Sequence, residues 1–570
     1  MRGIENCNSN SKFKFNQKKR FSTMTTNSFV REATIGAGTS FTENGAVSYA
    51  SIGTELLNQF AKAGTYRGRD LNDVFVQQAA LWAENPEDAL KFPFYLRMVT
   101  RKTKMFDAET ETVQRGQGAR DEAFKRLLWF AKYHPEVFYK NLWVLPLVGS
   151  WKDLWVLLSM DDSLNKKEFF KVMAMGINND YHRELVKKYM PRIRANKLCN
   201  TDWAKKTNRL AKEFCNFVGW TAKDYRTFKS TGKAHEFQRV ICARLYDNLN
   251  FKAIPGKALL NLVSGNFLQK HNLEEKYLSW VKTQPVAKFN GYPYELAMKC
   301  LPYRKTYWGS SRPMPAALKF TLDKQFANLI ETAKSDNGAI KGNVWCALDT
   351  SGSMTSLIDY NSPCKVTSFD VAVGLGIYFS TLNEGAFHKN VIMFDNTSEV
   401  LQLNGEFTDM YNQITSRRDA MGGTNFQSVI DEIVRIRKKN PNIPLEDYPE
   451  TLLVVSDMQF SISGGYWGQP KISEIEQMTN YETMKEKLLT VFPKDFVDKM
   501  KFVWWEVNGR TKDFPATMDH GGCYFFSGFD GSIISTLLGG SDNKELKMQP
   551  SMEEVIENVF SQEILGLLTL

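Results

Sequence analysis

The chain of 570 residues carries a net charge of +10, and 43% of its residues are hydrophobic. This length exceeds the size at which a single core stops growing, so we expect at least two domains. The hydrophobic content argues against general disorder, and the sequence has no apolar run long enough to span a membrane. The eight cysteines are scattered without a C-x-x-C pair, which is typical of a reducing compartment and favours the cytoplasm.

Residues 1–45 are expected to form a basic, disordered N-terminal tail. Between Asn6 and Arg31 there are six basic residues and no acidic one. An acid-poor start with arginine and serine is also found in mitochondrial transit peptides, which gives mitochondria as a minor alternative location. Met24 is an alternative start, in which case the first 23 residues are an upstream extension.

Residues 46–335 show mainly helical periodicity. Within 121–134, apolar side chains recur at Phe124, Leu127 and Leu128, the spacing of one helix face. Similar patterns predict helices over 151–160 and 181–198. Short breaks with glycine, proline or asparagine separate these segments. The pattern therefore predicts stacked helical pairs that form an α-solenoid or ring.

After Gly342, apolar runs rich in β-formers alternate with helical patterns. This alternation predicts a doubly wound, mostly parallel sheet in residues 340–570, an α/β (Rossmann-like) architecture. In such a fold, ligands bind beyond the carboxyl ends of the strands. The predicted strands are 343–349, 390–395, 398–403, 451–457 and 501–508, and the predicted helices are 369–382, 426–439 and 472–489.

Charge is divided unevenly between these two parts. Residues 181–320 contain 27 basic and 9 acidic residues, a net charge of +18. Residues 341–570 contain 19 basic and 31 acidic residues, a net charge of −12. Such asymmetry within one chain indicates that the two parts have different partners.

Acidic and hydroxyl side chains follow two of the predicted strands and one glycine-rich loop. Asp349 closes the first strand and is followed by Ser351 and Ser353, Thr424 lies in "MGGTNF", and Asp457 ends the "LLVVSD" strand. Five oxygen-bearing side chains at one sheet edge suit a hard divalent cation, and Mg²⁺ is the cation expected. A nucleophilic serine is not favoured, because the sequence has no G-x-S-x-G motif.

The order D-x-S-x-S, loop threonine and strand-end aspartate resembles the metal-ion-dependent adhesion site of von Willebrand factor A domains. Upstream of it lie "RGQGARDEAFKRLLWF" (115–130), "GSWKDLW" (149–155) and "RPMPAALKFTLDKQFANLI" (312–330). Together these motifs resemble the Ro ribonucleoprotein family, in which a ring of HEAT-like helical repeats, the TROVE module, precedes an A domain. A group of uncharacterised plant, fungal and viral proteins has the same layout. Here "GGTN" stands where Ro proteins commonly carry "GGTD".

The resemblance implies a function in RNA binding. In Ro proteins, single-stranded ends of misfolded RNA enter a basic hole in the ring, and small structured RNAs bind its outer face. The adhesion site usually takes a carboxylate from a protein partner. The excess of basic residues in 181–320 is consistent with this function, because phosphate contacts supply affinity that does not depend on sequence.

Ten basic residues are candidates for contacts with RNA, although any single one is more often a solvated surface residue. The first group is a dense run expected on one helical segment: Lys187, Lys188, Arg192, Arg194 and Lys197. The second group is Arg115, Arg120, Lys205, Lys206 and Arg209.

Three functions remain open on the sequence. The first is a non-enzymatic RNA-binding scaffold that binds small or misfolded RNA. The second is a metal-dependent protein–protein adaptor without RNA binding. In the third, the metal only stabilises the loops that bind it. Catalysis is not expected, because the sequence shows no nucleophile–base pair and no open zinc site.

Overall fold

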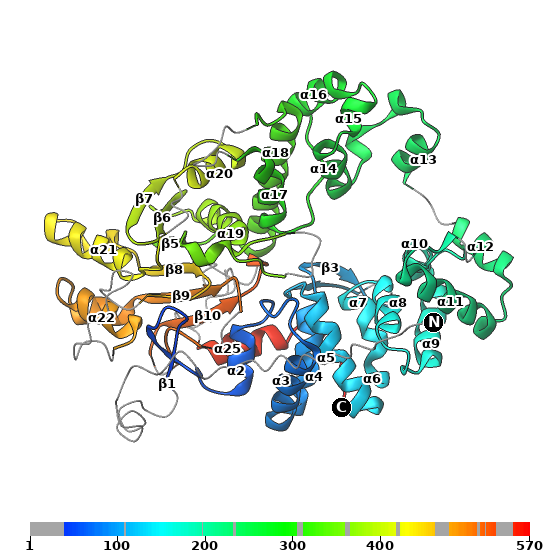
Figure 1. Cartoon of the computed structure of the whole chain (residues 1–570), viewed down its shortest axis with the longest axis horizontal. Coiled ribbons are helices and arrows are strands. Elements are labelled where there is room, and N and C mark those ends of the chain that lie inside the picture. Colours follow the sequence, from blue (N-terminus) through cyan, green and yellow to red (C-terminus); the bar gives the residue numbers. More distant parts are fainter. Residues whose placement is uncertain are drawn as a thin grey trace, which may run out of the picture.

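The computed structural model describes residues 39–107, 110–195, 198–231, 235–304, 312–359, 365–417, 422–461, 478–509, 513–518, 520–531 and 551–570. Residues 55–337 form a succession of helices that we call the helical arc. It is followed by an α/β domain built on a six-stranded sheet. Figure 1 shows the arc running from α2 through α8 and α10 to α18, beside the sheet. The predicted order of a helical part and an α/β part is confirmed.

The helical arc contains mostly short helices joined by short loops. Its helices are α2 (Glu55–Ala61), α3 (Leu71–Glu84), α4 (Pro86–Arg97), α5 (Arg120–Tyr133), α6 (Pro135–Asn141), α7 (Leu145–Val148), α8 (Trp151–Met160), α9 (Lys166–Asn178), α10 (Asp180–Tyr189), α11 (Asp202–Val218), α12 (Ala222–Ser230), α13 (Glu236–Cys242), α14 (Gly256–Ser264), α15 (Phe267–Lys270), α16 (Glu274–Thr283), α17 (Pro293–Cys300) and α18 (Ala316–Asn337). None of the described helices is long and apolar enough to cross a membrane.

The motif "GSWKDLW" is the start of α8. Ser150 and Asp153 form a capping box, in which each side chain accepts a hydrogen bond from the other residue's backbone. This arrangement satisfies amide groups that a helix start leaves unpaired. Asp153 is also buried in an ion pair with Arg97 of α4. The predicted helices over 121–134 and 151–160 are confirmed as α5 and α8.

The predicted single helix over 181–198 is wrong. Helix α10 ends at Tyr189, and Met190 is extended, with φ −56° and ψ 135°. The cause is Pro191, because its ring clashes with a helical conformation of the residue before it. The expected helical run of basic residues is therefore divided. Lys187 and Lys188 lie in the last turn of α10, whereas Arg192 and Arg194 lie in the non-helical segment after it.

The sheet of the α/β domain has the strand order β10-β9-β8-β5-β6-β7. Neighbouring strands are parallel except for β7, which is antiparallel to β6. The strands are β5 (Val344–Asp349), β6 (Asn390–Phe394), β7 (Ser398–Gln402), β8 (Thr451–Ser456), β9 (Lys501–Glu506) and β10 (Cys523–Ser527), and the helices are α19 (Ser368–Leu382), α20 (Phe407–Thr415), α21 (Gln427–Lys439), α22 (Asn480–Leu489), α23 (Lys494–Lys499) and α25 (Met552–Phe560). The predicted, mostly parallel sheet is confirmed.

The expected helix over 472–489 begins at Asn480, with Thr479 as its N-cap, and residues 462–477 lie outside the described part of the chain. Helix α19 is buried almost throughout because it lies between the sheet and the helical arc. A β-carbon at Gly374 would lie 2.8 Å from the backbone nitrogen of Tyr294 in α17. Glycine therefore allows α17 and α19 to pack closely.

Both ends of the helical arc contact the α/β domain. Near the first end, Lys62 forms a buried ion pair with Glu506 of β9. At the C-terminal end of the arc, Asp323 of α18 accepts hydrogen bonds from the backbone and hydroxyl of Thr408 in α20, at 2.9 and 2.8 Å. Helix α25 then returns to α4, where Phe560 packs against Tyr95. The arc and the α/β domain therefore form one closed circuit of contacts.

Candidate metal centre and basic pocket

The two predicted metal-binding acids lie at the same edge of the sheet. Strands β5 and β8 are parallel neighbours, with Leu348 opposite Val455. Asp349 is the last residue of β5, and Asp457 directly follows β8. The carboxyl ends of adjacent parallel strands meet at one edge, so the two carboxylates are placed together. Both residues are buried, with 0% and 1% of their surface exposed.

Hydrogen bonds connect four of the five predicted ligands. The backbone nitrogen of Ser351 donates to Asp349 Oδ1 at 2.9 Å. The hydroxyl oxygens of Ser351 and Ser353 lie 3.1 Å apart, and Ser353 donates to Asp457 Oδ1 at 3.3 Å. The D-x-S-x-S turn and the strand-end aspartate therefore form one cluster of oxygen atoms. We call this cluster, together with Thr424, the strand-end edge.

Thr424 reaches the strand-end edge from the loop before α21. The backbone nitrogen of Gly352 donates to the carbonyl of Gly422 at 3.0 Å, which joins this loop to the serine turn. A β-carbon at Gly422 would lie 2.7 Å from that of Asp395, so the close approach requires glycine. Thr424 is 1% exposed. All five predicted ligands therefore come from a strand end or from loops at the same end of the sheet.

The electrostatics of the strand-end edge fit a divalent cation. Burial raises the pKa of the Asp457 carboxyl, and repulsion by Asp349 raises it further. Burial likewise raises the pKa of Asp349. Asp457 Oδ2 is buried and has no hydrogen-bond partner among the described residues. A cation there would offset the repulsion and satisfy this oxygen.

The donor set also indicates which kind of cation would fit. Among the described residues there is no cluster of three or more His, Cys, Asp or Glu side chains that could hold a metal. A site here therefore depends on serine and threonine hydroxyls beside the two carboxylates. Such an all-oxygen set suits Mg²⁺ rather than zinc.

A hairpin from the N-terminus supports the strand-end edge. Strands β1 (Thr39–Phe41) and β2 (Val47–Tyr49) pair with each other. In the turn between them, the hydroxyl of Thr42 donates to the carbonyl of Phe460 at 2.7 Å, and the backbone nitrogen of Glu43 donates to Gln459 Oε1 at 2.7 Å. These contacts hold the loop that follows Asp457, so residues more than 400 positions apart stabilise one site.

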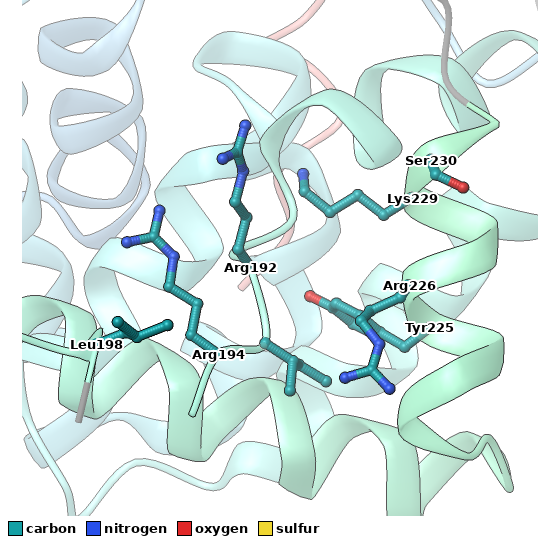
Figure 2. Close-up of a pocket in the computed structure, with 8 residues that line it drawn as sticks. Arg192, Arg194, Leu198, Tyr225, Arg226, Lys229 and Ser230 are labelled. Atoms are coloured by element: carbon teal, nitrogen blue, oxygen red, sulfur yellow. The ribbon is translucent and has the colours of Figure 1, made fainter. Parts of the chain in front are cut away.

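Two of the predicted RNA-binding residues, Arg192 and Arg194, line a pocket of about 610 Å³. We call it the basic pocket, and Figure 2 shows how its side chains lie. The lining residues are Arg192, Ile193, Arg194, Leu198, Tyr225, Arg226, Lys229 and Ser230. The pocket therefore lies between the segment after α10 and helix α12.

The backbone of the basic pocket is fixed by buried and half-buried side chains. The hydroxyl of Tyr225 donates to the carbonyl of Pro191 at 2.8 Å. Asn208 of α11 accepts from the backbone nitrogen of Arg194 at 2.9 Å and donates to its carbonyl at 3.2 Å. Lys229 donates to the carbonyl of Met190 at 2.6 Å. The arginine side chains therefore project from a rigid frame.

The structure places most of the other predicted RNA-binding residues in contacts within the chain. Lys187 is buried and pairs with Glu184 at 2.8 Å. On α11, the ammonium groups of Lys205 and Lys206 lie 3.5 Å from Asp202 and 3.0 Å from the carbonyl of Ser159. Arg209 pairs with Asp162, and Arg115 donates to the carbonyl of Asp336. Lys188 and Arg120 are exposed. Lys197 lies outside the described residues.

Sequence reasoning missed two cations of the basic pocket, Arg226 and Lys229. Their helix α12 carries the aromatic residues Tyr225 and Phe228, and interleaved basic and aromatic residues are a feature of nucleic-acid-binding surfaces. Tyr225 itself is 0% exposed, and the Phe228 ring lies 4.9 Å from the Lys187 ammonium. These aromatic residues therefore pack within the fold and do not offer free ring faces for stacking on bases.

Comparisons with known proteins gave three findings. Residues 344–564 match the family model described as "Domain of unknown function (DUF7788)". An uncharacterized protein of Acanthamoeba polyphaga mimivirus is 22% identical over 548 residues, which cover 90% of this chain and 86% of the viral protein. Among solved structures, the chain is similar to the RO (RSR) protein of Deinococcus radiodurans, with 14% identity and a TM-score of 0.37, over 85% of this chain and 92% of that chain.

Proposed function

We propose that this chain is a non-catalytic, cytoplasmic RNA-binding scaffold whose helical arc binds RNA and whose α/β domain binds Mg²⁺. The observation that carries the proposal is the basic pocket. Arg192, Arg194, Arg226 and Lys229 line it together, and none of the four forms an ion pair with a described acidic residue. Two of the other candidate cations on this arc do have such partners, because Lys187 pairs with Glu184 and Arg209 pairs with Asp162.

Unpaired cations at a concave surface attract polyanions. Each phosphate that they neutralise releases condensed counterions, so affinity falls as the salt concentration rises. The net charge of +18 over residues 181–320 extends this attraction beyond the pocket. The upstream motifs that resemble the Ro family support small structured or misfolded RNA as the natural class of ligand.

The proposal is tested with the full-length protein. RNA that copurifies is identified by crosslinking and sequencing, and the affinity for single-stranded RNA is measured at several salt concentrations. The combined change of Arg192, Arg194 and Arg226 to glutamate should lower the affinity by more than about tenfold, because each reversal replaces attraction by repulsion. RNA binding that is absent, or that does not depend on salt, contradicts the proposal.

A second candidate function is a metal-dependent adaptor for an acidic protein partner. It is favoured by Asp457 Oδ2, the buried carboxylate oxygen without a partner at the strand-end edge. Mg²⁺ held there by Asp349, Asp457 and the hydroxyls would keep positions for an outside carboxylate. If Asp349→Ala and chelation both abolish binding of a protein partner while RNA affinity is nil, the adaptor function is correct and the scaffold proposal fails.

A further inference from the structure

His182 is a buried titratable residue that neither proposed site uses. It lies in the first turn of α10 and is 3% exposed. Aromatic rings surround it: the centroids of Phe106, Tyr181 and Trp151 lie 4.5, 5.1 and 5.6 Å from that of the imidazole. Helices α8 and α9 pack beside α10 at this point (Figure 1). The side chain therefore lies in a largely apolar environment that disfavours a charge.

The hydrogen bond between His182 and Trp151 requires a neutral imidazole. The indole nitrogen of Trp151 donates to His182 Nδ1 at 3.3 Å. An indole N–H can only donate, so Nδ1 must keep its lone pair. In a protonated histidine both ring nitrogens carry hydrogen, so the two N–H groups would face each other and the bond would be lost. Protonation and this contact are therefore incompatible.

No described acidic side chain is placed to compensate a charge on His182. The acids on the surrounding elements have other partners: Asp153 pairs with Arg97, Glu168 with Lys171, Asp180 with Arg183 and Glu184 with Lys187, and Asp107 accepts from Thr110. The cations on these elements cannot compensate a positive charge; they include Arg101, Lys104, Lys152 and Lys229. A protonated His182 would therefore be a buried charge without a counterion.

Two further effects act against the charged form. Burial lowers the pKa of His182 from its ordinary value, and the backbone of Met105 only partly opposes this shift. His182 also lies in the first turn of α10, where a positive charge is unfavourable to the helix dipole. Protonation should therefore weaken both the packing of α10 and the helix itself.

Helix α10 has few other anchors. Its buried side chains are those of His182, Val186 and Lys187. Its N-cap, Asn179, donates to the carbonyl of Phe106 at 2.7 Å, so the start of the helix is attached to the same aromatic surroundings. Loss of the His182 contact would therefore remove a large part of what holds α10 in place.

The far end of α10 leads into the frame of the basic pocket. Lys229 of α12 donates to the carbonyls of Lys187 and Met190 at 3.0 and 2.6 Å, and Tyr225 donates to that of Pro191. These bonds connect α10 to α12 and to the segment that carries Arg192. A displacement of α10 therefore reaches the backbone of the pocket.

We propose that His182 is a pH-sensitive anchor, whose protonation releases α10 from α8 and loosens the frame of the basic pocket. An unfolded histidine titrates near pH 6.5. Because the folded pKa is lowered, the stability that neutral His182 contributes is present above this pH and is lost as the pH falls below it. Between the two pKa values, the equilibrium constant for opening of α10 should rise by up to about tenfold for each pH unit.

This device does not depend on the proposed function, because it concerns the attachment of α10. It does predict an unusual sign for RNA binding at the basic pocket. Protonation of surface histidines adds positive charge and strengthens phosphate binding. Release of α10 should instead weaken RNA binding below pH 6.5, because the pocket loses its frame.

The test measures hydrogen exchange of the full-length protein at pH 7.5 and 5.5, with rates corrected for intrinsic exchange. Protection of the α10 amides should fall by at least about threefold at pH 5.5. Helix α16, which has no histidine, is the internal reference. A local measurement is needed because the pKa values of Asp349 and Glu506 in the α/β domain are raised to about 6 and about 7, so global unfolding also depends on pH.

Variants assign the effect to His182. His182→Gln stays neutral and can still accept from Trp151 through its amide oxygen, whereas His182→Phe stays neutral and keeps an aromatic ring. In both, the protection of α10 should no longer depend on pH, whatever its absolute level. The control is His235→Gln, a change of an exposed histidine before α13, which should keep the wild-type pH dependence.

A direct titration covers the case in which both variants lose α10 at every pH. NMR of the wild-type chain with labelled histidine follows the six imidazoles, and the signal missing in His182→Gln identifies His182. A pKa below 6.5 supports the anchor, and a pKa at or above 6.5 overturns it.

The remaining outcomes separate this inference from the proposed function. Wild-type protection of α10 that does not change with pH overturns the anchor, and so does a pH dependence that survives in both variants. If α10 opens at pH 5.5 while RNA affinity is unchanged or rises, the anchor stands and the basic pocket is not the RNA site.

Discussion

The strand-end edge and the basic pocket carry charge in opposite ways. At the strand-end edge, Asp349 and Asp457 are buried and lie 108 positions apart in the chain, joined by hydrogen bonds through the serine turn. In the basic pocket, Arg192 and Arg226 are exposed, lie 34 positions apart in the chain, and have no acidic partner among the described residues. The acids of the strand-end edge are therefore buried within the fold, whereas the arginines of the basic pocket are exposed at its surface.

This difference has an energetic consequence. A buried charge that loses its partner remains in a low-dielectric environment and destabilises the fold. An exposed charge is solvated whether or not it is paired, so its removal changes little except the binding of an ion. We therefore expect substitutions at the strand-end edge to affect stability and metal binding, and substitutions in the basic pocket to affect RNA binding alone.

The largest effect on stability is expected for the buried ion pair between Lys62 and Glu506, which lies at the same end of the sheet as the strand-end edge. The side chains of Lys62 and Glu506 are 2% and 5% exposed. Lys62→Ala leaves Glu506 buried without its cation, and the expected loss of unfolding free energy is about 3–5 kcal/mol. Arg226→Ala should cost less than about 0.5 kcal/mol, as for most surface changes. Denaturant unfolding of both variants measures the contrast, and equal losses would contradict it.

The next effect concerns the metal. Asp457→Ala removes a buried carboxylate of the proposed Mg²⁺ site and should weaken Mg²⁺ binding by more than about a hundredfold, a larger loss than supporting residues around a metal typically cause. Calorimetric titration with Mg²⁺ measures the affinity. Asp447→Ala, an exposed acid of the same domain, is the control. Mg²⁺ should also raise the unfolding midpoint of the wild-type chain but not that of Asp457→Ala. An undiminished Mg²⁺ affinity in Asp457→Ala would refute this site.

The two sites also differ in how far the sequence predicts them. The common location of the five predicted metal ligands could be predicted, because strand ends of a parallel sheet share an edge. These residues are Asp349, Ser351, Ser353, Thr424 and Asp457, and their binding of a metal stays a prediction. The two acids only had to be placed at the ends of apolar runs, the serines in the turn after Asp349, and Thr424 in the glycine-rich loop before a helix. The support from Thr42 and Glu43 could not be predicted, because it depends on a hairpin that meets its partner more than 400 residues away.

The basic pocket was predictable only as an excess of charge. Pro191 ends α10, so the expected helical run was divided; this feature is visible in the sequence because proline restricts the residue before it. The pairing of Lys206 with Ser159 and of Arg209 with Asp162 depends on how α11 packs beside α8. Such tertiary contacts decide which cations remain free, and charge patterns do not contain them.

A smaller effect is expected in the salt dependence of RNA binding. The triple change of Arg192, Arg194 and Arg226 to alanine should reduce the slope of log affinity for single-stranded RNA against log salt by about two, because up to three fewer phosphates are neutralised. The unfolding free energy should be unchanged, because these guanidinium groups lie on exposed residues. An unchanged slope would show that the arginines do not bind phosphate.

The smallest effect compares two adjacent lysines of α10. Lys188 is exposed, whereas Lys187 is 9% exposed, pairs with Glu184 and lies over the Phe228 ring. Lys188→Ala should reduce the salt slope by about one and leave stability unchanged. Lys187→Ala should do the reverse, because its stem and charge are used within the fold. Salt titrations and unfolding curves on both variants separate the two roles, and if Lys187→Ala weakens RNA binding at constant stability, burial does not divide the structural cations from the binding ones.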